Sequence, residues 1–281
     1  MPTQLKAHTA TADVAGKNGH SLISGEKFRE LYAWLVKCEL LERHLGSSTA
    51  SLDEAVAAVG ITLDLGREDT VVLGPRTYAA NLIKGVPLRA LLAHYKNGHG
   101  SVPLTFSAVN AVSIAGLSAV RPAGLATGAA LANKMARSRH IAVAFIDGDA
   151  VALAECKAAF EVASANQLPV LYVLHASPGR KLKRALSEAA KLVPVIAVDA
   201  HDVVAIYRVA QESIARVRQG YATIIICVDC HMNGTPRCAL ASMERYLEGK
   251  KLSCNEWKQQ AIAEFERELT AACLPQANPL A

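Results

Sequence analysis

The sequence predicts an α/β protein: a three-layer domain in which a parallel sheet carries helices on both faces. Four continuous apolar runs, at residues 140–147, 168–176, 192–200 and 222–230, have the length of strands and alternate with segments of helical length. Strands without a polar side are buried on both faces, which is typical of parallel sheets covered by helices. The composition agrees: 51% of the residues are hydrophobic but only 5% are aromatic, so small aliphatic side chains fill the predicted layers.

The segments around these strands are predicted to be helical, because their apolar residues recur every three or four positions. The first helix follows Ser24, a suitable N-cap, and places Phe28, Leu31 and Leu35 on one face. Further helices are predicted within residues 51–65, 76–98, 122–138, 203–220 and 242–272, and Gly85-Val86-Pro87 divides the segment 76–98 into two. A short apolar segment at 70–74 and a long loop over 99–118, ending near the strand-like 111–116, complete the pattern.

We expect one core domain at residues 24–272, preceded by a flexible polar lead-in at 1–23 and followed by a tail at 273–281. The net charge of +5 comes from basic residues interleaved with acidic ones, which indicates a solvated surface and not a nucleic-acid-binding one. No apolar run reaches the length of a membrane span, and the N-terminus lacks a secretory pattern. Seven cysteines at irregular spacing suit reduced thiols, so a cytoplasmic protein is expected.

Two strand ends carry the residues of greatest chemical interest. The run at 140–147 is followed by the turn Asp147-Gly148-Asp149-Ala150, and the next strand ends in His175-Ala176-Ser177. An acidic glycine turn between a buried strand and a helix is the shape of a unit that holds a phosphate or a metal ion. The same acids are equally suited to capping the following helix, and His175 to a hydrogen bond within its loop.

The order of the segments resembles the alpha subunit of the thiamine-diphosphate-dependent 2-oxo acid dehydrogenases, the group that includes the pyruvate, branched-chain and acetoin dehydrogenases. The resemblance extends from about residue 26 to residue 272. It is carried by the runs LYAWLVKCELLERHL, DEAVAAVGITLDL, RTYAANLIKGVPLRALL, ATGAALANK, AVAFIDGDA, QLPVLYV, VDAHDVVAIYRVAQESIARVRQG and MERYLEGKKLSCNEWKQQAIAEFERELTAA.

This resemblance implies a thiamine-diphosphate-binding fold that holds the diphosphate through Mg²⁺. It also implies a beta-type partner subunit, which in two-chain members supplies the glutamate that activates the aminopyrimidine of the cofactor. A homodimer of this chain is the expectation if no beta-type chain exists. The resemblance assigns no catalytic residue to this chain.

The family signature is a Gly-Asp-Gly turn after one strand and an Asn at the end of the next, and this chain departs from both. An ungapped register puts Gly148 on the ligand Asp, whereas a register shifted by one keeps Asp149 as the ligand and aligns Gly148 and Ala150 with the glycines. The Asn position falls on Ser177 or a neighbour. The implied metal ligands are therefore Asp149 or Asp147 together with Ser177, because a hard cation requires oxygen donors.

A basic residue completes the implied cofactor site. Where the family pairs an aromatic residue with an arginine at the diphosphate, this chain has Pro75-Arg76. Arg76 is the implied diphosphate-binding residue, although it could equally pair with Asp69 or Glu68.

Two functions follow from the resemblance. The first is a working alpha-type subunit that takes part in oxidative decarboxylation of a 2-oxo acid or acetoin and in acyl transfer to a lipoyl carrier. The alternative is a non-catalytic relative that keeps the fold and its dimer surfaces and binds the cofactor weakly or not at all. The departures concentrate in the site loops, whereas the first and last helices match well.

Overall fold

The computed structural model describes residues 23–45, 52–73, 78–96, 104–106, 110–113, 120–147, 150–176, 179–228, 238–252 and 255–273. The strands are β1 Thr70–Leu73, β2 Leu104–Phe106, β3 Ala111–Ser113, β4 Ala142–Asp147, β5 Val170–Ala176, β6 Val195–Asp199 and β7 Thr223–Val228. The helices are α1 Gly25–Leu45, α2 Leu52–Thr62, α3 Tyr78–Ile83, α4 Leu88–Lys96, α5 Val120–Met135, α6 Ala150–Glu155, α7 Lys157–Ala165, α8 Arg180–Ala189, α9 Val203–Val217, α10 Ala239–Gly249 and α11 Asn255–Cys273.

These strands form one sheet in the order β2-β3-β1-β4-β5-β7-β6. All neighbouring pairs are parallel except β2 and β3, which run antiparallel at one edge. The parallel α/β class is confirmed. The prediction of a continuous loop over 99–118 is wrong at Leu104–Phe106, because these three residues pair with β3.

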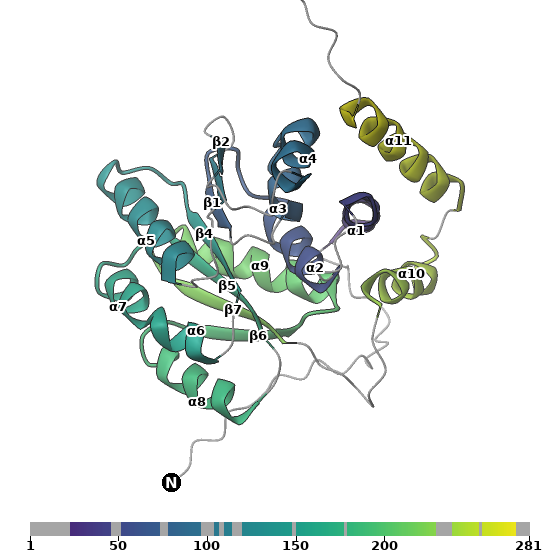
Figure 1. Cartoon of the computed structure of the whole chain (residues 1–281). Helices are drawn as coiled ribbons and strands as arrows, with labels where there is room; N and C mark the ends of the chain where they lie inside the picture. The colour runs from purple at the N-terminus through teal and green to yellow at the C-terminus, as the bar shows by residue number, and fades with distance from the viewer. Residues whose placement is uncertain are drawn as a thin grey trace, which may run out of the picture.

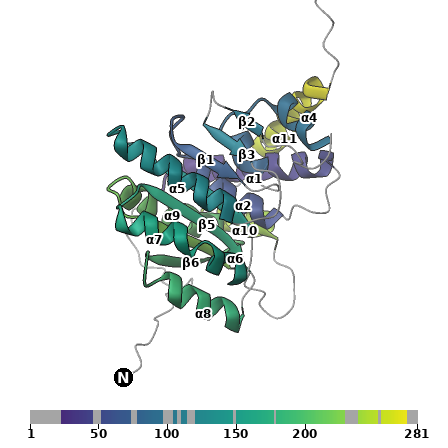
Figure 2. The ribbon, with the colours of Figure 1, turned by 60° about the vertical axis from the view of Figure 1, so that its left-hand side comes forward.

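Alternate side chains of each central strand enter two separate hydrophobic cores. In β4, Val143 and Phe145 pack on one side of the sheet, while Ala144 and Ile146 pack on the other. The first core joins the sheet to α1–α4 and α9–α11, and the second joins it to α5–α8. Figure 1 shows α5–α8 along one side of the sheet, and Figure 2 shows them lying in front of it. This is the predicted three-layer arrangement, and it explains why the strands have no polar side.

Helix α5 lies very close to the sheet, as its small residues predict. Ala123, Ala126 and Ala130 are fully buried against β1 and β4. Thr127, on the same face, lies 2.7 Å from the hydroxyl of Tyr172 in β5. The hydroxyl of Tyr172 also donates to the carbonyl of Ala159, 3.2 Å away in α7. Small side chains allow the close approach, and the hydroxyl pair satisfies the polar groups that the approach buries.

The predicted ends of several helices are confirmed. The backbone N–H of Lys27 donates to the Ser24 hydroxyl at 3.2 Å, as expected of an N-cap. Gly85 separates α3 from α4 with φ of +88°, a conformation that glycine adopts without steric cost. None of the described helices combines the length and the apolarity that crossing a lipid bilayer requires.

An ion pair between a buried aspartate and a solvent-accessible arginine ties three distant segments together at the amino ends of β1 and β4. Asp69, only 1% exposed, accepts two hydrogen bonds from the Arg218 guanidinium, at 3.0 and 2.6 Å. Its carboxylate also accepts the backbone N–H of Ile141 at 3.0 Å and of Gly66 at 2.8 Å. Lys84 closes the same loop by donating to the carbonyls of Gly66, Arg67 and Asp69, at 2.7, 3.0 and 2.9 Å.

The free energy of unfolding should fall by about 2 kcal/mol in Asp69→Asn, because the amide loses the charge-assisted hydrogen bonds that the buried carboxylate accepts from Arg218 and from two backbone amides. Burial raises the pKa of Asp69, but hydrogen bonds from Arg218 and from the Ile141 and Gly66 amides outweigh it and hold the pKa below its ordinary value. A lowered folded-state pKa means that this stability is complete above the unfolded-state pKa and is lost as the pH falls through the folded-state one.

Urea denaturation at neutral pH and under acidic conditions measures both effects. The matched control is Glu188→Gln, which removes an exposed pair with Lys191 and should leave the urea midpoint almost unchanged. Equal urea midpoints for Asp69→Asn and the wild type would show that the pair of Asp69 and Arg218 does not stabilise the fold.

Helix α2 crosses α9 at Gly60, where no side chain fits. A Cβ at Gly60 would lie 2.6 Å from Cγ2 of Ile206 and 3.2 Å from the backbone nitrogen of Tyr207. In α5, a Cβ at Gly124 would meet nothing within 4 Å. Gly60→Ala should therefore destabilise the protein by about 1–3 kcal/mol through overpacking. Gly124→Ala should raise stability by up to about 1 kcal/mol through helix propensity alone. Thermal denaturation of both variants checks the contrast, and a stabilised Gly60→Ala would show that α2 and α9 pack less closely.

Candidate functional site

The carboxyl ends of the parallel strands meet at one edge of the sheet, and the chain reverses its direction of winding there. From β1 the chain passes over the first core through α3 and α4 to reach β3. From β4 it passes over the second core through α6 and α7 to reach β5, in the opposite direction. The neighbouring strands β1 and β4 thus flank a topological switch point, the place where open α/β sheets bind ligands.

Strand register brings the predicted segments to this edge. Asp147, the last residue of β4, is the register partner of His175 in β5. His175 is in turn paired with Cys227 in β7. The segments after β4 and β5 therefore leave the sheet side by side, and the segment that carries Arg76 follows the neighbouring strand β1.

The structure places only part of the predicted set. The backbone of Asp147 ends β4 and that of Ala150 begins α6. The other four predicted residues, Gly148, Asp149, Ser177 and Arg76, lie outside the described residues. Their roles in cofactor and metal binding stay predictions.

The donor chemistry of this edge does not fit a complete Mg²⁺–diphosphate site. A Mg²⁺ ion prefers near-octahedral oxygen ligands. Strand β5 ends in His175-Ala176, and Ser177-Pro178-Gly179 follow in the sequence. The resemblance predicts Ser177, with its short hydroxyl, at the position where the family has an Asn. Within the described part of the chain, no group of three or more His, Cys, Asp or Glu side chains is placed to hold a metal ion. Two acids of the turn 147–150 and one serine are the oxygen donors that the sequence supplies here.

The two acids considered as alternative partners for Arg76 have described contacts of their own. Asp69 lies at the amino end of β1, where Arg218 and two backbone amides occupy its carboxylate. Glu68 lies beside it, with its backbone carbonyl accepting from Asn110 at 3.0 Å. Arg76 itself lies outside the described residues, so its pairing with either acid stays a prediction.

The buried thiols of the described residues contribute no nucleophile. Burial raises the pKa of Cys38, Cys156 and Cys227 to about 12 in each case, with a nearby acid adding to the effect. A thiol with such a pKa stays protonated at neutral pH and neither attacks a substrate nor binds a metal as thiolate.

The sequence reading missed a second polar feature at the carboxyl edge. Just past the end of β6, the buried His201 lies with its Nδ1 3.4 Å from Oδ1 of Asp199. The same aspartate accepts the backbone N–H of His201 at 3.0 Å. A cavity of about 340 Å³ opens beside it between α9 and α10, with Ser242, Arg245 and Tyr246 in its wall. In the sequence, the signal for this feature is Asp199 at the end of an apolar run with His201 two residues later.

Comparison with protein families agrees with this architecture. The family model described as "Dehydrogenase E1 component" matches residues 42–233. This range contains every described strand of the sheet, the acidic turn after β4 and the end of β5. The chain belongs to the dehydrogenase E1 component family, whose members depend on thiamine diphosphate. This confirms the resemblance drawn from the sequence. No curated protein matches the chain.

Proposed function

We propose that the chain is the alpha-type subunit of a 2-oxo acid or acetoin dehydrogenase, which oxidatively decarboxylates its substrate and passes the acyl group to a lipoyl carrier. The observation that carries the proposal is the switch point between β1 and β4 in a chain of this family. The segments that bear Arg76 and the acidic turn 147–150 both leave the sheet there. Thiamine diphosphate, when bound, supplies the chemistry of decarboxylation.

Within this proposal the predicted residues have separate roles. Arg76 and the backbone around Gly148 and Ala150 face the diphosphate, while Asp149 or Asp147 together with Ser177 supply oxygen ligands to Mg²⁺. A beta-type subunit contributes the glutamate that activates the cofactor. The domain bounds of 24–272, a cytoplasmic location and the absence of nucleic-acid and membrane partners belong to the same proposal.

One specific observation favours a second function, that of a non-catalytic relative. Compared with the family signature, the segment after β5 lacks the Asn, and the Asp after β4 is shifted by one residue. Both departures would weaken the same metal site, whereas the sheet and both cores are intact. In this alternative the chain keeps the family fold as an assembly surface and binds the cofactor weakly or not at all.

Thiamine diphosphate with Mg²⁺ should bind more weakly than low-micromolar, because the hydroxyl of Ser177 replaces an amide oxygen of longer reach. Titration calorimetry on the purified chain measures the affinity directly. Nanomolar or low-micromolar binding would contradict the weakened metal site.

Restoring the amide should strengthen binding. We expect Ser177→Asn to increase the Mg²⁺-dependent affinity by about tenfold, equivalent to about 1.4 kcal/mol. The matched control is Ser187→Asn in α8, an exposed position where the same change should have no effect. Equal affinities for Ser177→Asn and the wild type would show that Ser177 does not occupy the ligand position.

The state of assembly separates the two functions. A beta-type chain that co-purifies with this one, together with decarboxylation of a 2-oxo acid by the complex, supports the dehydrogenase subunit. A stable homodimer without a partner, with no increase in melting temperature in millimolar thiamine diphosphate and Mg²⁺, supports the non-catalytic relative. Size measurement by light scattering and a thermal-shift series provide both results.

A further inference from the structure

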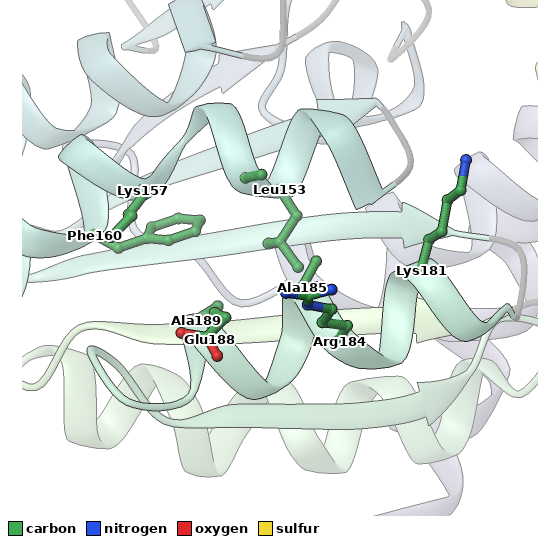
Figure 3. Close-up of a pocket in the computed structure, with 9 residues that line it drawn as sticks. Leu153, Lys157, Phe160, Lys181, Arg184, Ala185, Glu188 and Ala189 are labelled. Atoms are coloured by element: carbon green, nitrogen blue, oxygen red, sulfur yellow. The ribbon is translucent and has the colours of Figure 1, made fainter.

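An apolar groove lies between α6–α7 and α8, on the outer side of the second core. Its volume is about 440 Å³, within the range of ligand-sized pockets. Figure 3 shows Leu153 and Phe160 on one wall and Ala185 and Ala189 on the other, with Leu153 pointing towards Ala185. The groove is separate from the carboxyl edge residues described above, none of which lines it.

The rim of this groove is positively charged. Lys157, Lys181 and Arg184 line it together with a single acid, Glu188. That acid is already engaged, because Nζ of Lys191 lies 2.7 Å from Oε1 and 2.8 Å from Oε2 of Glu188. Hydrogen bonding to Lys191 and the nearby charges of Arg184 and Lys157 hold the pKa of Glu188 below its ordinary value, so the acid stays ionised and offsets part of the positive charge of the rim. Lys157 also lies 3.5 Å from Glu161, so Lys181 and Arg184 are the rim cations that form no described salt bridge.

The cations on α8 are placed where the helix itself disfavours them. Four of its first five residues are basic, namely Arg180, Lys181, Lys183 and Arg184, and the first turn contains no acid. The amino end of a helix carries a partial positive charge, so cations there repel it and one another. No described carboxylate forms a salt bridge with any of these four side chains. An external anion would relieve this repulsion.

The spacing of the exposed cations on α8 suits a partner helix. Leu182 and Ala189 turn one face of α8 to the sheet, and all four cations are exposed to solvent. Lys181 and Arg184 are three residues apart, so they stand about 4.5 Å apart along the helix axis. A partner helix presents carboxylates at the same interval from positions i and i+3, and its apolar residues lie between them.

We propose that this groove is a docking site for an acidic amphipathic helix of a protein partner. An apolar side chain of that helix packs against Ala154 and Ala185, which are lining residues accessible to solvent, and its carboxylates pair with Lys181 and Arg184. The interaction does not depend on thiamine diphosphate, so it goes beyond the proposed function and is tested independently of it.

The test uses a synthetic peptide of about 18 residues, long enough for a marginal helix, with leucines on one face and glutamates beside them. A second peptide has lysine in place of each glutamate. Fluorescence anisotropy with the full chain should show saturable binding of the acidic peptide only, and the affinity should fall as salt is added.

Three variants locate the contact. The charge reversal Lys181→Glu with Arg184→Glu and the plug Ala185→Trp, which leaves every charge in place, should each weaken acidic-peptide binding by about tenfold or more. The matched control is Arg29→Glu with Arg267→Glu, an equal charge change at exposed residues of α1 and α11 on the other layer. It should bind the peptide as the wild type does. Circular dichroism verifies that each variant is folded.

Several results would overturn the proposal. Equal binding of the acidic and basic peptides would mean that the rim does not select charge. Unchanged binding in the folded charge-reversal and plug variants would place the contact elsewhere. Binding to anionic phosphatidylserine vesicles without binding to the acidic peptide would identify a membrane surface and not a protein as the partner.

Discussion

The ion pair between the buried Asp69 and Arg218 is the constraint on which the position of the site depends. It joins the loop before β1, the start of β4 and the end of α9, three segments far apart in the chain, through one carboxylate. Lys84, directly after α3, fixes the same loop by three hydrogen bonds to backbone carbonyls. With the amino ends of β1 and β4 held in register, the switch point at their carboxyl ends has a fixed geometry. Burying the Asp69 carboxylate removes it from water, and the hydrogen bonds that it accepts from Arg218, Ile141 and Gly66 offset this cost.

The scaffold and the site loops have different requirements. Alternate side chains of the central strands fill two cores, and this demands only apolar residues of the right volume. A Mg²⁺ site demands particular oxygen donors at particular distances, so in the proposed site a serine at the predicted Asn position would affect the metal and leave the cores unchanged. The family fold can therefore persist in full while its metal site weakens, which is why both a working subunit and a non-catalytic relative are compatible with this sheet.

The central strands, most helices and the three-layer class were predictable because their signals are local: apolar runs, helical periodicity, and Ser24 and Gly85 at helix ends. Strand β2 was not, since three residues carry too short a pattern and gain their structure from pairing with β3. Asp69 was considered only as an alternative partner for Arg76, whereas its observed partner Arg218 lies just after α9 and leaves no local signal. At the site, the ends of β4 and β5 were located correctly. Which acid faces a cation depends on the orientation of side chains, and spacing alone does not determine it.

The central claim is that this E1 component keeps the family fold around a weakened metal site. Electron paramagnetic resonance of Mn²⁺, a spectroscopic substitute for Mg²⁺, tests it most directly, because bound and free Mn²⁺ give distinct signals. The protein, with any partner that co-purifies, is titrated with Mn²⁺ in the presence and absence of thiamine diphosphate. The account predicts that Mn²⁺ stays almost entirely free at equimolar protein under both conditions. One tightly bound Mn²⁺ per chain that appears only with thiamine diphosphate would contradict it.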